Sequence, residues 1–275
     1  ASSGVNPERV FDFRVFPTGH LCTGPAKWGG AVAIGNTVVA VPLDAPGVLL
    51  LDMVAFTASE FSTEQICSCS AKWNGAAVVG TKVVGTPFDA PGALVLDMAS
   101  RSTSIISTEH LCSGSAKWGA AVSIGSKVVA MPLDAPGVLV LDLTPGLGPG
   151  TASMISTEHI WSGPGKWSSA CVIGNKVVGV PMDAPGLLVV DLAAGSVWLI
   201  STDHLWSGPG KWSGAAAVGT RVVAIPSCAP GVMVLDIESG VTSMIPTDHV
   251  CTGACKWSGA ISVGSKVVAA PFDAP

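Results

Sequence analysis

The dipeptide Lys-Trp occurs six times along the chain at a nearly constant spacing, and this repetition limits the possible folds more than any other feature. Successive lysines are 45, 45, 49, 45 and 45 residues apart, at Lys27, Lys72, Lys117, Lys166, Lys211 and Lys256. A period of this length is typical of one supersecondary unit copied along a chain. An unbroken array of such units predicts a single domain over residues 1–275.

Each copy divides at turn signals into four short apolar segments. In the third copy, the first segment ends at Gly125-Ser126, a pair that suits a two-residue hairpin. The second segment stops at Pro132, and the turn Asp134–Gly137 leads into the third. The two middle segments are apolar throughout rather than alternating, which indicates that neighbours cover both faces of each small sheet.

Four-stranded antiparallel sheets stacked face to face around an axis form a β-propeller. We therefore predict an all-β, six-bladed propeller whose blade repeats begin near the six lysines. The sixth copy ends at Pro275, after its second segment. We expect residues 1–20, which contain the segment Glu8–Phe16, to complete the sixth blade and close the ring, so that no strand edge is exposed. A fragment of a longer array is the alternative.

The order of the segments resembles the Kelch repeat in all six copies: a small-residue strand, a Gly turn, a Val-Val strand and a Val-Leu-Val-Leu-Asp strand. The chain departs from that repeat in having x-Pro, as in Val41-Pro42 and Thr86-Pro87, in place of Gly-Gly, and in containing no Tyr. It looks closer to Kelch-like repeats of algae and protists, which have Lys-Trp-x-Gly before the first strand and Pro-x-x-Ala after the second. The resemblance implies a propeller but no defined activity.

Composition excludes some classes of partner. The chain is 48% apolar and 12% charged, with a mean hydropathy of +0.55, so much of it must be buried. The net charge of −5 comes without a basic cluster, which argues against nucleic acid. The sequence contains no run of eighteen apolar residues, so no membrane span is predicted and we expect a soluble protein. The start at Ala1 fits a processed or a trimmed chain, and the compartment stays open.

The eight cysteines do not predict a metal centre. Four of them occupy one slot that holds Trp161 and Trp206 in the other copies, which indicates apolar packing: Cys22, Cys67, Cys112 and Cys251. The pairs Cys67-x-Cys69 and Cys251-x3-Cys255 leave a disulfide or a metal site open, although neither has a second pair at zinc-finger spacing. We expect no metal and no cofactor.

Polar residues also recur at fixed slots. The stretch between copies contains His20, His110, His159, His204 and His249. The turn after the second segment contains Asp44, Asp89, Asp134, Asp183 and Asp273, where the fifth copy has Cys228. In a four-stranded meander both connections emerge at one end of the sheet, so lysines, histidines and aspartates should ring one face. Each lysine is expected to meet a turn aspartate, a pairing that the fifth copy lacks.

This face has two interpretations. In the first, the lysines and histidines contact a ligand or partner around a central channel. In the second, the repeated residues are structural, because buried polar groups need partners and a large aromatic at the start of an inner strand packs between blades. We assign structural roles to the turn aspartates and to Trp28, Trp73, Trp118, Trp167, Trp212 and Trp257. A second cationic slot on the opposite face is expected to be a solvated rim, with Thr37 in the first copy and Lys82, Lys127, Lys176, Arg221 and Lys266 in the others.

The evenness of the copies favours a non-enzymatic binding or scaffolding propeller, with a protein or a small polar ligand as its partner. One alternative is a structural subunit of a larger complex. The other is a hydrolase-type enzyme with its site on the same face, for instance with Cys228 as nucleophile and His204 or His249 as base.

Overall fold

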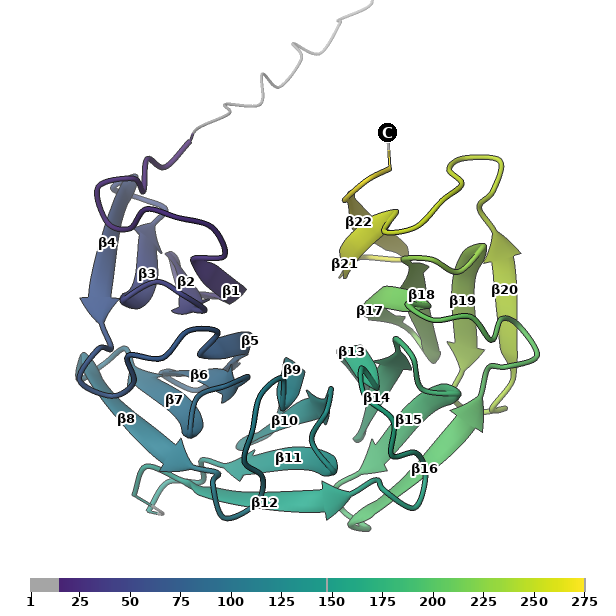
Figure 1. Cartoon of the computed structure of the whole chain (residues 1–275), viewed down its shortest axis with the longest axis horizontal. Helices are drawn as coiled ribbons and strands as arrows, with labels where there is room; N and C mark the ends of the chain where they lie inside the picture. The colour runs from purple at the N-terminus through teal and green to yellow at the C-terminus, as the bar shows by residue number, and fades with distance from the viewer. Residues whose placement is uncertain (1–14, 147, 275) are drawn as a thin grey trace, which may run out of the picture.

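The computed structural model describes residues 15–146 and 148–274, which form an arc of sheets around a hollow centre (Figure 1). Five sheets are four-stranded antiparallel meanders, and a sixth has two strands. Blades one and two consist of β1 (Trp28–Ile34), β2 (Thr37–Pro42), β3 (Gly47–Asp52), β4 (Thr57–Ser62), β5 (Trp73–Val79), β6 (Lys82–Pro87), β7 (Gly92–Asp97) and β8 (Ser102–Ser107). Blades three and four consist of β9 (Trp118–Ile124), β10 (Lys127–Pro132), β11 (Gly137–Asp142), β12 (Thr151–Ser156), β13 (Trp167–Ile173), β14 (Lys176–Pro181), β15 (Gly186–Asp191) and β16 (Ser196–Ser201). Blades five and six consist of β17 (Trp212–Val218), β18 (Arg221–Pro226), β19 (Gly231–Asp236), β20 (Thr242–Pro246), β21 (Trp257–Val263) and β22 (Lys266–Pro271).

The turn residues act as the repeat predicts. Gly125 has a φ of +59° between β9 and β10, a left-handed conformation that glycine adopts without steric cost. Pro132 ends β10 opposite Trp118, after a shift in strand register. At the end of a strand the missing proline N–H removes no bond from the middle of the ladder.

The hydrophobic core lies in layers between successive blades. At the boundary of blades two and three, Trp118, Val128 and Leu139 pack against Val84 and Val95 of the preceding sheet. Trp118 is fully buried. Burying one such apolar side chain stabilises a fold by about 1.5–3 kcal/mol, so each boundary contributes to the arc in the same way.

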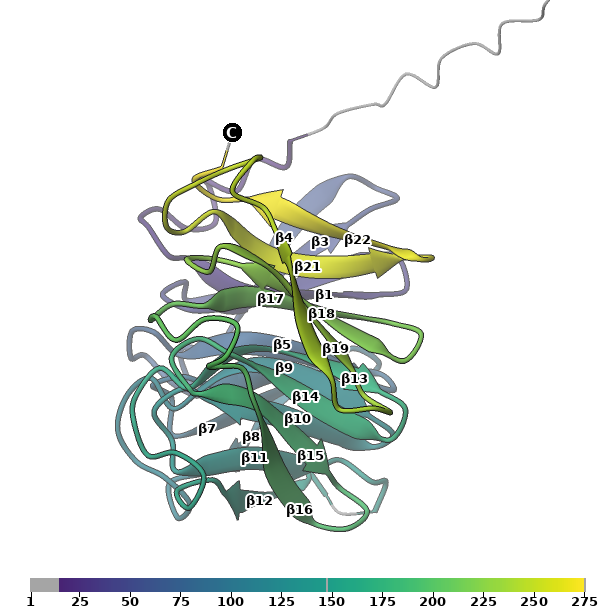
Figure 2. The same ribbon diagram turned by 90° about the vertical axis from the view of Figure 1, so that its right-hand side faces the viewer.

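The two faces of the disc differ. Figure 2 shows the hairpin of β21 and β22 projecting from one side and the loop that leads into β21 on the other. We call the side with the loops between blades the loop face and the opposite side the hairpin face. Within the described residues, no helix is long and apolar enough to cross a membrane.

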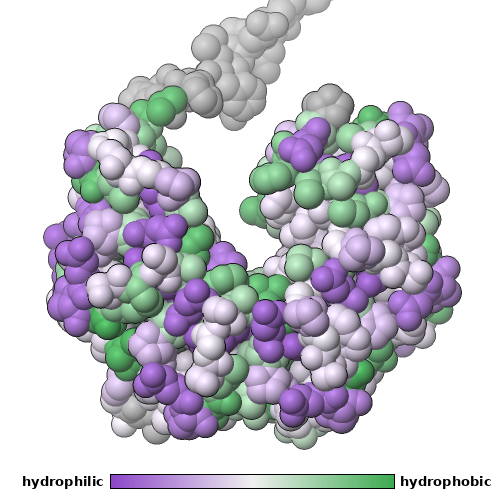
Figure 3. All heavy atoms as spheres, in the orientation of Figure 1, coloured by the Kyte–Doolittle hydropathy of each residue, from purple (hydrophilic) through white to green (hydrophobic). Residues whose placement is uncertain are grey.

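The predicted six-bladed, all-β propeller is confirmed as five complete blades and a two-stranded sheet in the sixth position. The arc is open between blades one and six (Figures 1 and 3). Closure by residues 1–20 rests mainly on residues 1–14, which lie outside the described part of the chain, and Val15 and Phe16 are not in a strand. Blade six therefore exposes apolar side chains toward the opening, among them Ile261 and Val268.

Candidate functional site

The lysines of the Lys-Trp pairs are held inside the loops of the loop face. Lys117 is only 2% exposed, and its Nζ donates a 2.8 Å hydrogen bond to the carbonyl of Gly114. Burial lowers the pKa of Lys117, and the charge of Asp89 opposes this shift. Carbonyls of the loops or turns also accept from Lys72, Lys166, Lys211 and Lys256. These ammonium groups support the loops rather than face a ligand.

Lys27 is the exception, because blade one has no preceding blade beside it in the described arc. It is half-buried, and its Nζ lies 5.5 Å from the ring centroid of Trp28. This distance allows a cation–π contact.

The turn aspartates join neighbouring blades through the backbone. Asp134 Oδ1 accepts a 2.9 Å hydrogen bond from the N–H of Gly165, which belongs to the next blade. The same bond joins Asp44 to Ala71, Asp89 to Ala116 and Asp183 to Gly210. The expected lysine–aspartate pairing is therefore wrong: in the described residues no ion pair joins these two slots, because the carboxylate faces an amide and the lysine faces loop carbonyls. We call the aspartate–amide bond the blade staple.

The five histidines are all exposed, at the outer ends of the loops between blades. His204 Nε2 lies 3.1 Å from the hydroxyl of Thr242, which begins the outer strand β20 of the next blade. This histidine is therefore at the circumference rather than at the central channel. The proposed ligand contacts of the histidines stay a prediction.

The tryptophans lie at the blade boundaries. Trp73, Trp118, Trp167 and Trp212 are fully buried. In each case the indole N–H donates to a glycine carbonyl of its own blade, as from Trp118 to Gly137 at 2.8 Å. Trp28 makes the same bond to Gly47, and Trp257 is half-buried.

The central channel is lined by small apolar side chains of the inner strands. A cavity of about 430 Å³ there is bordered by Ala76, Ala77, Val122, Ser123 and their neighbours. In the described residues, no group of three histidines, cysteines or acids is placed to hold a metal ion. The channel wall thus offers little polar chemistry.

The cysteines have different states. Cys67 and Cys69 form a disulfide with a Cα–Cα distance of 5.6 Å, one of the alternatives that the sequence leaves open. The other six are thiols. Cys171 is buried, which raises the pKa of its thiol to about 12. The described residues show no hydrogen bond between Cys228 and a histidine, so the nucleophile–base pair of the enzyme alternative gains no support.

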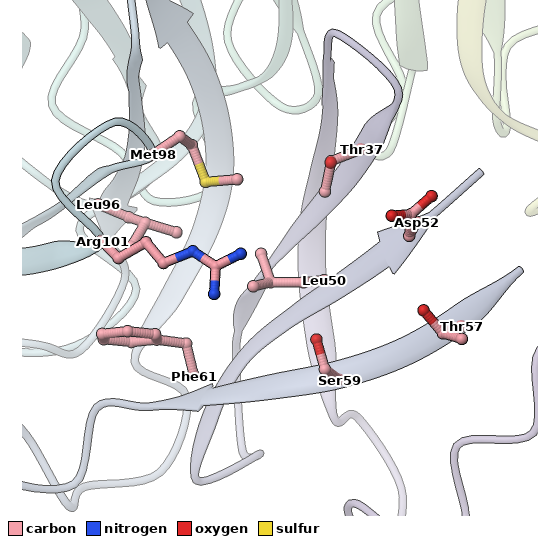
Figure 4. A pocket seen from close by; sticks show the side chains of 9 residues that line it. All are labelled: Thr37, Leu50, Asp52, Thr57, Ser59, Phe61, Leu96, Met98 and Arg101. Carbon is pink, nitrogen blue, oxygen red and sulfur yellow. The ribbon is translucent and has the colours of Figure 1, made fainter. Parts of the chain in front are cut away.

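A pocket of about 270 Å³ lies between blades one and two, toward the hairpin face (Figure 4). Blade one contributes Thr37, Leu50, Asp52, Thr57, Ser59 and Phe61, and blade two contributes Leu96, Met98 and Arg101. The register of β3 and β4 pairs Leu50 with Ser59 and Asp52 with Thr57, which brings their side chains to one face of the sheet. The pocket therefore combines an apolar floor with hydroxyls and two opposite charges.

The pocket coincides with a break in the repeat at residue 37. In blade three the slot holds Lys127, which forms an ion pair with Asp142, the residue that ends the third strand. Lys176 and Arg221 approach the corresponding aspartates within 3.9 and 4.0 Å. Thr37 is too short to do the same, and no cation pairs with Asp52 in the described residues. Backbone N–H groups of Ala55 and Val54, in the following turn, donate to Asp52 and lower its pKa, so the carboxylate is charged.

Arg101 is a second departure from the repeat. It follows β7 with a φ of +52°, in a turn slot that holds the left-handed glycines Gly195 and Gly240 in blades four and five and Phe56, at a φ of +53°, in blade one. A side chain in this conformation costs roughly 1 kcal/mol relative to glycine. The guanidinium extends over Leu50 and Phe61 (Figure 4) and has no hydrogen-bond or ion-pair partner in the described residues.

The repeat pattern does not predict Arg101 as a site residue and assigns Thr37 to a solvated rim. The available signal is a threonine in a cationic slot, together with an arginine in a turn slot that holds glycine in blades four and five. Only the packing of blade one against blade two shows that these two exceptions meet.

Comparisons with known proteins agree with the fold and do not identify a family. No family model matches the chain, and no curated protein matches it. The Kelch-like resemblance therefore stays a prediction.

Among solved structures, the computationally designed Ika8 protein is similar over 90% of this chain and 69% of its own, with 15% identity and a TM-score of 0.63. The extracellular domain of a putative one component system, BT4673 from B. thetaiotaomicron, matches 89% of this chain with 11% identity and a TM-score of 0.65, and the match spans 31% of that protein. A chain of the Nidogen/Laminin complex matches with 10% identity and a TM-score of 0.58, over 88% of this chain and 87% of its own. At these identities the likeness concerns the fold alone, which is that of a β-propeller.

Proposed function

We propose that the protein is a non-enzymatic binding module and that the pocket between blades one and two receives an acidic–apolar segment of a partner protein. The observation that carries this proposal is the meeting of two departures from the repeat. Among the described residues, Thr37 leaves Asp52 without a cation, and Arg101 places a guanidinium with no hydrogen-bond or ion-pair partner over Leu50 and Phe61. Unpaired charge and backbone strain at one place favour a binding role.

The chemistry of the pocket selects the partner. A guanidinium presents a rigid set of N–H donors that fits a carboxylate, and a hydrogen bond to a charged group contributes about 1.5–3 kcal/mol. Leu50, Phe61, Leu96 and Met98 provide an apolar surface beside it. A cavity of about 270 Å³ accepts one or two side chains, so we expect an apolar side chain flanked by Asp or Glu.

The six lysines of the Lys-Trp pairs give little support to a binding site on the loop face. Five of the six are at most 3% exposed and bonded to carbonyls. We therefore place the proposed site between blades one and two, and retain the exposed histidines as a weaker candidate for contacts on the loop face.

An array of short peptides tests the proposal. Wild-type protein should bind peptides in which Leu or Phe is flanked by acids, and should bind the same peptides with lysines instead, which only Asp52 would attract, more weakly. Arg101→Gly, which restores the residue of blades four and five, should abolish this preference. Equal binding by wild type and Arg101→Gly would show that the pocket is not the site.

A second candidate function is that of a structural subunit. It is favoured by the exposed apolar face of blade six, where Ile261, Val263 and Phe272 are each more than 60% exposed. Exposed apolar patches often mark contact surfaces. A native mass above that of the monomer, reduced by Ile261→Ser, would support this function, and a monomer at all concentrations would exclude self-assembly.

A further inference from the structure

Two cysteines depart from the repeat at slots that meet across one blade boundary. Cys228 occupies the slot of the turn aspartate, and Cys255 occupies the slot that precedes the lysine. In the other copies the second slot contains Ala26, Ala71, Ala116, Gly165 and Gly210. These two slots form the blade staple at the first four boundaries, with N···O distances of 2.7–2.9 Å. Both cysteines thus occupy the staple positions of the fifth boundary, between blades five and six.

The backbone at this boundary matches that of its neighbour. Lys256 N–H donates to the carbonyl of Ser227 at 3.2 Å, as Lys211 N–H donates to Met182 at 2.8 Å beside the staple of Asp183 and Gly210. Cys228 follows the acceptor and Cys255 precedes the donor, so the two cysteines flank one hydrogen bond. A disulfide needs Cα atoms roughly 4.4–6.8 Å apart. At the other boundaries the short Asp side chain of the first slot reaches the backbone N–H of the second, which shows that these two slots lie close together.

The thiols at this boundary are accessible and have room to turn. Cys255 is exposed and Cys228 is half-buried. The Sγ of Cys228 lies beside Gly210, 3.1 Å from the position that a Cβ would take. Because residue 210 is glycine, the Cys228 side chain keeps space to rotate toward Cys255.

We propose that Cys228 and Cys255 form a disulfide that replaces the aspartate staple between blades five and six. A thiol is a weak hydrogen-bond acceptor, so the reduced pair does not reproduce the bond that Asp183 makes to Gly210. The oxidised pair joins the blades covalently. Redox state then sets how firmly blade six, with two described strands, is attached.

The reaction balances with a small disulfide, such as oxidised glutathione, as the oxidant. The Cys255 thiolate attacks one sulfur of that disulfide, which forms a mixed disulfide and releases one small thiol. The Cys228 thiolate then attacks the Cys255 sulfur and releases the second small thiol. Two electrons pass from the cysteine pair to the oxidant, and the two protons lost by the cysteines end on the released thiols.

Alkylation of denatured protein and peptide mapping test this proposal. After oxidation with glutathione disulfide, denatured but unreduced protein should show four free thiols rather than the six of protein in which only Cys67 and Cys69 are bonded. Cleavage before aspartates should yield the peptide 203–235 linked to 248–272 with the loss of two hydrogen atoms. Cys251→Ser should keep this link and Cys255→Ser should lose it, which separates Cys255 from the nearby Cys251.

A stability measurement provides a control that does not depend on the mapping. The oxidised wild type should unfold at a higher temperature than the reduced protein. Cys228→Asp restores the residue of the other copies and should lose the part of this temperature difference that the proposed link causes, leaving only the part that the Cys67–Cys69 disulfide contributes. Six thiols after oxidation, or a link between Cys251 and Cys255, would overturn the proposal.

Discussion

Lys127 and Asp142 form an ion pair at the hairpin face of blade three, between the first residue of β10 and the last residue of β11. The lysine is the main reason that the pKa of Asp142 is lowered to about 2, and Thr144 adds two hydrogen bonds. The same pair of slots in blade one holds Thr37 and Asp52, where the missing cation accompanies a pocket. The residue at the start of the second strand, Lys127 in blade three and Thr37 in blade one, thus distinguishes the solvated rim from the candidate site.

Lys127→Thr should raise the pKa of Asp142 toward the ordinary value of 3.8, but not fully, because the Thr144 bonds remain. A carboxyl with a lowered folded-state pKa stabilises the fold above pH 3.8 and loses this effect as the pH falls toward 2. The variant should therefore lose less stability over this acidic range than wild type. NMR titration of the Asp142 carboxyl checks the shift, and an unchanged pKa would contradict the role of Lys127.

Arg101→Gly should stabilise the fold by roughly 1 kcal/mol, because glycine adopts the left-handed turn without cost. Arg101→Lys keeps both the strain and the charge, so its stability should match that of wild type. Urea unfolding measures both variants. A stability loss in Arg101→Gly would mean that the guanidinium supports the fold, which would remove the case for a binding residue.

Asp134→Ala should destabilise the propeller by about 0.5–1.5 kcal/mol, because the Gly165 amide loses its acceptor in a solvent-exposed hydrogen bond. Asp273→Ala is the matched control: in the described residues no following blade lies beside this turn, and the loss should stay below roughly 0.5 kcal/mol. Chemical unfolding of the two variants checks the staple. Equal losses would show that the aspartate acts within its own turn.

Lys117→Met should remove one contribution to the rise of stability at alkaline pH. Burial lowers the pKa of Lys117, so the unfolded chain binds more protons than the folded one as pH approaches 10.5, and stability rises with pH there. The variant should lack this contribution and should also leave the Gly114 carbonyl without its lysine donor. Unfolding free energies at neutral and alkaline pH, compared with those of wild type, measure the difference.

The repeat predicts the fold because period and turn chemistry are local properties. Gly125, Pro132 and the turn at Asp134 occur at the same offsets in copy after copy, and each fixes a strand end without reference to the rest of the molecule. The closure of the ring is different, because it depends on residues 1–14, outside the described part of the chain.

Which repeated residues contact one another is harder to predict than where each residue lies in the repeat. The sequence places Lys117 and Asp89 on one face, but it does not show that the lysine turns into its own loop while the carboxylate meets the Ala116 amide. The pocket has the same cause: Thr37 and Arg101 are 64 positions apart, and only the packing of two blades brings them together.

The affinity of an acidic–apolar peptide for two variants of residue 37 tests the proposed pocket most directly. Thr37→Lys restores the cation of the other blades, which should pair with Asp52 and fill the pocket, whereas Thr37→Ser should leave it open. Isothermal titration should show binding at least about tenfold weaker for Thr37→Lys, a difference of about 1.4 kcal/mol, and unchanged for Thr37→Ser. Equal affinities for the two variants would contradict the assignment of this pocket as the binding site.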